Sequence, residues 1–206
     1  MKMKTIKEQT IRLIIIAVLV LFTAVAFTQS AVAQTSYKVG AGSQIKVSGT
    51  SNLHDWNMLT GNFSCQGNFI MKNGALQDVS SLMFTLPVIN LRSKDKLMDT
   101  RAYKTLNEEK YKMITFRLTN ATVVPQLKII RVTGDLTISG VTKLVSMQTA
   151  YVVNADESIT CKGTKTIKMS NYAIKAPSFM MGALKTGDDV TIDILLKLKK
   201  DSLTLN

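Results

Sequence analysis

The sequence is poor in the side chains that metal sites and catalytic centres use most. Its 206 residues include one histidine, two cysteines and one tryptophan. A zinc site made of several histidines is therefore excluded. The sequence contains neither the C-x-x-C pair of a thioredoxin-like protein nor the G-x-S-x-G motif of a serine hydrolase. We therefore expect no catalytic residues, no bound metal and no cofactor.

His54 is the residue whose chemistry most needs an interpretation. By ligand type it could share a metal site with Asp55, Cys65 and Cys161, but their spacing does not resemble a metal-binding knuckle. It could also act as a general base, although no nucleophile motif accompanies it. We predict instead a structural role, or contact with the headgroup of a ligand.

The sequence also lacks a Pro-, Gly- or Ser-rich linker, and its N-terminal apolar run is short for a membrane span. Residues 13–27 supply about fifteen apolar positions, whereas a spanning helix needs about twenty. The run follows a basic head made of Lys2, Lys4, Lys7 and Arg12. A small-x-small site follows at residues 31–33, which predicts a signal peptide cleaved between Ala33 and Gln34; an uncleaved anchor is the alternative. Residues 34–206 are then expected to form one domain, periplasmic or secreted.

The two cysteines both fall in the predicted exported domain, where conditions are oxidising. A disulfide between Cys65 and Cys161 and a pair of buried free thiols both remain open. Sequence alone gives neither their distance nor their connectivity.

The chain has few acidic residues for its number of basic ones. Its formal net charge is +12, and about +9 remains once the predicted signal peptide is removed. The lysines occur singly along alternating segments, as Lys162, Lys165 and Lys168 do, without interleaved aromatic residues. This pattern argues against nucleic-acid binding and predicts a solvated basic surface. A weak attraction to anionic lipid headgroups is the functional alternative.

Apolar residues in the predicted mature chain recur with a period of two, which is typical of β-strands. The clearest runs are residues 114–118, 130–138 and 190–198, and further candidates are 37–48, 61–71, 75–87, 144–154 and 158–169. Turn sequences such as Asn73-Gly74 and Ser139-Gly140 separate these runs. Residues 95–106 and 177–184 break the alternation, and a short helix is predicted at each. The pattern predicts an all-β fold, an eight-stranded antiparallel β-barrel with one or two short helices.

The side chains predicted to point into this barrel are almost all apolar. They are Phe63, Phe69, Phe84, Leu86, Phe116, Leu118, Val132, Leu136, Met147, Tyr151, Ile167, Met169, Ile192 and Ile194. Trp56 is added near one end, and Met180 and Met181 as an adaptable lid. At about 0.8 kcal/mol per buried methylene, fifteen such groups of a hydrocarbon ligand would contribute roughly 12 kcal/mol before the costs of association. A packed core uses the same residue types, so a filled barrel remains the alternative.

Four stretches of the sequence resemble the YceI-like family. They are residues 49–56 (GTSNLHDW), 106–116 (LNEEKYKMITF), 134–143 (GDLTISGVTK) and 185–190 (KTGDDV), of which the third is the most specific. The resemblance extends over about residues 37–199. Lys112 departs from it, because the family usually has proline at this position, and the departure concerns the local path of one loop.

The resemblance implies an exported, lipocalin-like barrel that takes the long tail of a polyisoprenoid or isoprenoid quinone and has no assigned catalysis. The expected partner is thus an apolar isoprenoid lipid, which the protein would carry or store. Two other hypotheses remain. One is an envelope assembly module with a filled barrel, and the other is a lipid-modifying enzyme that uses His54 as its base.

Overall fold

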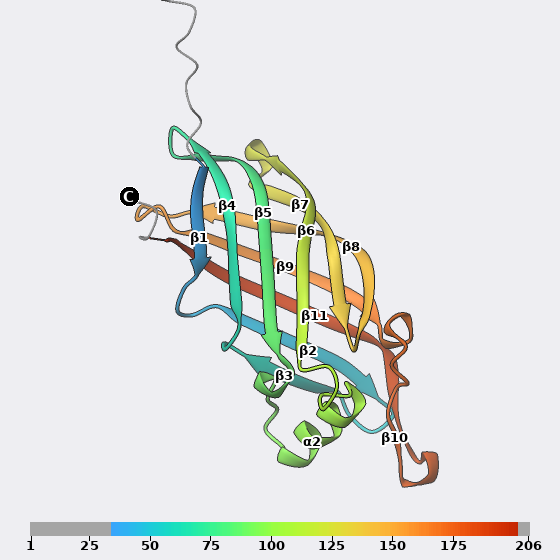
Figure 1. The fold of residues 1–206 in the computed structure, drawn as a ribbon. Helices are drawn as coiled ribbons and strands as arrows, with labels where there is room; N and C mark the ends of the chain where they lie inside the picture. Colours follow the sequence, from blue (N-terminus) through green and yellow to red (C-terminus); the bar gives the residue numbers. More distant parts are fainter. Residues whose placement is uncertain (1–33, 202–206) are drawn as a thin grey trace, which may run out of the picture. The chain divides into compact units, whose positions relative to one another are not determined.

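The computed structural model describes residues 34–201, without the side chains of Phe179 and Met180. These residues form a closed antiparallel β-barrel (Figure 1). Its strand order is β1-β4-β5-β6-β7-β8-β9-β11, and pairing of β1 with β11 closes the ring. The strands of the ring are β1 (Gln34–Val39), β4 (Ser64–Lys72), β5 (Ala75–Pro87), β6 (Met113–Val124), β7 (Ile129–Ile138), β8 (Val141–Val153), β9 (Ile159–Lys168) and β11 (Leu184–Lys200). The predicted eight-stranded antiparallel barrel is confirmed. The predicted signal peptide lies outside the described residues.

The strand predicted over residues 37–48 is in fact broken in two. β1 ends at Val39, and β2 (Gln44–Ser51) continues along the same edge of β11. Gly42 lies in the break with a φ of 80°, a backbone conformation that residues other than glycine rarely adopt. A further strand, β3 (Trp56–Thr60), was missing from the sequence prediction; it pairs with β2 and precedes β4.

Two-residue turns hold neighbouring strands in register. Asn73 and Gly74 join β4 to β5 with φ values of 51° and 74°, and Ser139 and Gly140 join β7 to β8 with 48° and 78°. Positive φ at both central residues matches the twist of a hairpin. Both predicted turns are confirmed.

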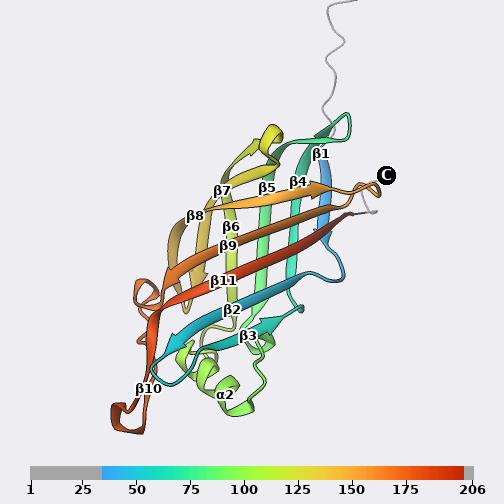
Figure 2. The same ribbon diagram turned by 180° about the vertical axis from the view of Figure 1, so that it is seen from behind.

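The helix predicted over residues 95–106 is present as α2 (Lys96–Thr105). It begins where the Asp95 carboxylate accepts a hydrogen bond of 2.8 Å from the backbone N–H of Leu97. Its apolar side packs with Met98 and Ala102 against Met58, Leu86 and Leu91. Figures 1 and 2 show α2 at the end of the barrel opposite the β4–β5 turn.

The second predicted helix, at residues 177–184, is wrong. This segment forms the short strand β10 (Ser178–Phe179), which pairs with the start of β11, and then the 3-10 turn η4 (Met180–Gly182). Met181 and Gly182 have φ values of 54° and 91°, so a right-handed helix cannot continue through them. Three other 3-10 turns are η1 (Val88–Asn90), η2 (Pro125–Leu127) and η3 (Met169–Tyr172).

Packed side chains fill the end of the barrel near the β4–β5 turn. Tyr37 stacks edge to face on Phe69 at 5.1 Å between ring centroids, and Leu76, Ile159 and Leu198 complete this buried core. Two smaller buried clusters lie toward the opposite end, one of Leu136, Ile138, Met169, Tyr172, Ile174 and Val190 and one of Met58, Leu86 and Leu91 beside α2. Within residues 34–201, no helix has the length and apolar character needed to cross a membrane.

Candidate functional site

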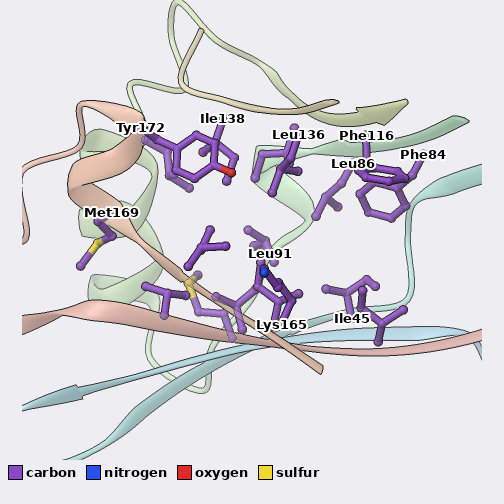
Figure 3. A pocket seen from close by; sticks show the side chains of 18 of the residues that line it. Ile45, Phe84, Leu86, Leu91, Phe116, Leu136, Ile138, Lys165, Met169 and Tyr172 are labelled. Carbon is purple, nitrogen blue, oxygen red and sulfur yellow. The ribbon is translucent and has the colours of Figure 1, made fainter. Parts of the chain in front are cut away.

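A cavity of about 630 Å³ occupies the barrel between this core and the α2 end. Its walls are apolar side chains contributed by β2 to β9 and β11, and Figure 3 shows them converging from several strands. A cavity of this volume is in the size range of pockets that hold small ligands. The barrel therefore contains a continuous apolar space, and the filled-barrel hypothesis does not describe it.

Alternation along the strands produces most of this lining. On β11, Val190, Ile192 and Ile194 face the cavity. Between them, Thr191 and Asp193 face outward, where each makes a hydrogen bond to a threonine of β9. A period of two thus places every second side chain in the lumen.

Most of the predicted ligand-binding residues line the cavity. These are His54, Trp56, Phe69, Phe84, Leu86, Phe116, Val132, Leu136, Met147, Ile167, Met169, Ile192 and Ile194. Their contact with a ligand stays a prediction, since their position shows access and not occupancy.

Four predicted residues lie away from the cavity lining. Phe63 packs on Phe84 at 5.3 Å between ring centroids, in the break between β3 and β4. Leu118 joins the packed core beside the irregularity at residues 118–120, and Tyr151 is buried in that same core. Met181 is fully exposed, so its side chain does not close the cavity as a lid. The side chain of Met180 lies outside the described part of the chain.

The residues around His54 form the rim of the cavity. Ser51 Oγ accepts a hydrogen bond from the His54 backbone N–H at 3.1 Å and donates one to the His54 carbonyl at 2.7 Å. The His54 side chain is exposed. Trp56 Nε1 donates to the Thr50 carbonyl, and the Trp56 ring lies where a side chain on Gly49 would be. Among residues 34–201, no three His, Cys, Asp or Glu side chains come together as metal ligands.

The two cysteines lie in the lumen as buried free thiols. Burial raises the pKa of Cys65 and of Cys161 to about 12, and for Cys65 the nearby Cys161 adds to the effect. Both groups therefore keep their protons near neutral pH. Because the thiolate is the nucleophile, neither cysteine is activated for catalysis.

Lys165 is the lining residue that sequence reasoning misplaced. It was grouped with Lys162 and Lys168 on a solvated surface, but it lines the cavity while the other two are exposed. The alternation of side chains along β9 could have shown its position. Lys165 is an even number of positions from Cys161 and Ile167, which also face the lumen. Three lysines spaced three apart cannot all lie on one face of a strand.

The YceI-like domain matches residues 25–198. The chain belongs to the YceI-like family. Among curated proteins, none matches it in sequence.

Solved structures share the fold of this YceI-like chain at low sequence identity. BcnA from Burkholderia cenocepacia has a TM-score of 0.66 and 20% identity over 77% of this chain and 98% of its own. A polyisoprenoid-binding domain from Saccharophagus degradans, implicated in plant cell wall breakdown, has a TM-score of 0.61 and 11% identity over 82% and 100%. The YceI protein of Campylobacter jejuni has a TM-score of 0.55 and 16% identity over 74% and 85%. At these identities, the likeness shows the fold alone.

Proposed function

We propose that this YceI-like protein binds a polyisoprenoid or the tail of an isoprenoid quinone inside its barrel, as a carrier or reservoir in the periplasm. The observation that supports it most is the continuous apolar cavity of about 630 Å³. Burial of a hydrocarbon tail there gains affinity without polar recognition. The family match and the polyisoprenoid-binding domain among the similar structures agree with this ligand class.

The alternative enzyme hypothesis has less support from the geometry. His54 is exposed at the rim, and the cysteine thiols are protonated deep in the lumen. A general base needs its substrate proton within hydrogen-bonding reach, and a nucleophile needs activation. The described residues around the cavity provide neither a general base placed in this way nor an activated nucleophile.

The protein would exchange its ligand at an anionic membrane surface. Leu53 is 70% exposed beside His54, and Met181 is fully exposed in η4, which follows β10. Asn52 joins these two segments, since its side chain bonds to the Ala183 carbonyl and to the Lys185 backbone N–H at 2.7 and 2.9 Å. Exposed apolar side chains near the cavity opening, on a domain of basic charge, suit a lipid surface.

Native mass spectrometry of protein purified from its own envelope, followed by lipid extraction, tests the ligand. We expect a bound mass that extraction identifies as an isoprenoid. Trp56 is the single tryptophan and lines the cavity, so its fluorescence reports rebinding to delipidated protein. Protein that carries no lipid and takes up neither farnesol nor a quinone would contradict the proposal.

The proposed location has its own test. Mature protein recovered from cells should begin at Gln34, as the signal-peptide prediction requires. N-terminal sequencing that finds Met1 retained on membrane-bound protein would reverse the assignment.

A further inference from the structure

A lysine ammonium inside an apolar cavity is the feature that hydrocarbon binding leaves unexplained. Lys165 lies near the middle of β9, between Cys161 on the core side and Ile167 on the side of the opening. Figure 3 shows its side chain among those that line the cavity. The other charged lining residues, Asp95 and Arg101, are exposed residues at the start of α2 and on it.

No partner for this ammonium is found within residues 34–201. The ion pairs of this part of the chain involve other lysines and arginines, and Lys165 takes no part in any of its side-chain hydrogen bonds. The carboxylate of Asp95, which also lines the cavity, already accepts from the Leu97 backbone N–H. Lys165 is half-buried, and a partly desolvated ammonium among apolar groups without a partner is less favourable than a methionine of similar length would be.

A second polar group points into the same cavity. Tyr172 in η3 is 2% exposed, and its hydroxyl has no hydrogen-bond partner among the described residues. Figure 3 shows the oxygen directed toward the cavity interior. Burial raises the pKa of Tyr172, so its hydroxyl remains a hydrogen-bond donor. Buried donors are almost always paired, and an unpaired one needs an explanation.

We propose that the lumen binds an amphiphile with an acidic headgroup, a carboxylate or a phosphate, held inside the barrel by Lys165 and Tyr172. The ammonium supplies a counter-charge and the hydroxyl a donor, and the remaining lining covers the tail. A full negative charge compensates a cation better than a neutral carbonyl or hydroxyl does. The inference rests on the proposed binding of an isoprenoid-like tail, and it places the headgroup at Lys165 and not at His54 on the rim.

Three ligands with the same fifteen-carbon tail test this: farnesol, farnesoic acid and farnesyl phosphate. Delipidated full-length mature protein is titrated with each at neutral pH, with Trp56 fluorescence and calorimetry as readouts. We expect at least one of the acidic ligands to bind roughly ten- to a hundredfold more tightly than farnesol, as a charge-assisted hydrogen bond does. The acid that shows the preference identifies the headgroup as carboxylate or phosphate.

Lys165→Met should abolish this preference, so that the acidic ligands bind no more tightly than farnesol. Lys162→Met is the matched control, because it removes the same charge from the exposed face of the same strand and should keep the preference. Tyr172→Phe should reduce the preference by a smaller factor. Thermal melting of each variant establishes that it is folded.

The possible results separate the two proposals. Farnesol binding without any preference for an acid in the unaltered protein would overturn the inference and leave the proposed function standing. A preference that survives in Lys165→Met would overturn it as well. If none of the three ligands binds, the proposed function itself fails and the inference fails with it. The comparison in the unaltered protein does not depend on the folding of any variant.

Discussion

At the scale of single residues, the two aromatic rings Phe116 and Phe69 sit in different surroundings. Phe116 is half-buried, and its ring lies over Gly134 and borders the cavity. Phe69 also borders the cavity, but it is 1% exposed and packs on Tyr37 in the buried core. We expect Phe69→Ala to lower the free energy of unfolding by about 3 to 5 kcal/mol, and Phe116→Ala by less than about 3 kcal/mol. Urea unfolding of delipidated protein measures both, and an equal loss for the two variants would contradict an open cavity at Phe116.

His54 offers a second test at this scale. If tail burial dominates, His54→Ala should keep most lipid affinity, since one hydrogen bond to a headgroup contributes only about 0.5 to 1.5 kcal/mol net. Bound lipid and lipid turnover are measured together on the variant and on the unaltered protein. A variant that retains its ligand but loses a reproducible turnover would support the enzyme hypothesis instead.

At the scale of secondary-structure elements, α2 depends on one side chain at its start. Asp95→Ala removes the hydrogen bond to the Leu97 N–H, and we expect a loss of about 1 kcal/mol in stability. Because α2 packs beside the cavity, the variant should also exchange bound lipid faster. Lys96→Ala is the control, an exposed residue whose side chain makes no cap. Stopped-flow Trp56 fluorescence gives the exchange rate, and unchanged exchange with lowered stability would show that α2 does not gate the cavity.

The elements also show what the sequence could predict. Alternation located β5, β7 and β9 almost to their ends, because one face of each strand is apolar. It failed at Gly42 and Met181, where the path depends on left-handed φ values that no periodicity reveals. It also missed β3, because this strand has only five residues and is defined by its pairing with β2 in the folded structure.

The same limit applies to the candidate site. The alternation of side chains along each strand predicts most of the lining positions. It would have predicted Lys165 too if the alternation had been given more weight than the charge of the side chain. Tyr172 could not have been found this way, because it lies in a 3-10 turn beyond the end of β9. The register irregularity beside Leu118 could likewise not be predicted from the hydrophobic pattern.

At the scale of the whole molecule, the two lumen thiols couple stability to alkaline pH. The pKa of each is raised to about 12 by burial, above its value in an unfolded chain near 9. Their contribution is therefore complete below pH 9 and is lost as the pH rises from 9 to 12. Urea unfolding across this range should give a flatter pH dependence for the Cys65→Ala/Cys161→Ala double variant. Equal slopes for the two proteins would contradict the buried protonated state, and comparing slopes cancels the titration of tyrosines and lysines.

The seventeen-residue strand β11 has a consequence for synthesis. It pairs with β9 along one edge and with both β1 and β2 along the other, so one late segment of the chain joins the earliest strands to the last ones. Such long-range pairing makes closure of a barrel slow. Until residues 184–200 have been made, β1 and β2 lack this neighbour and the lumen side chains face water. The barrel therefore cannot enclose a ligand before residues 184–200 have been made.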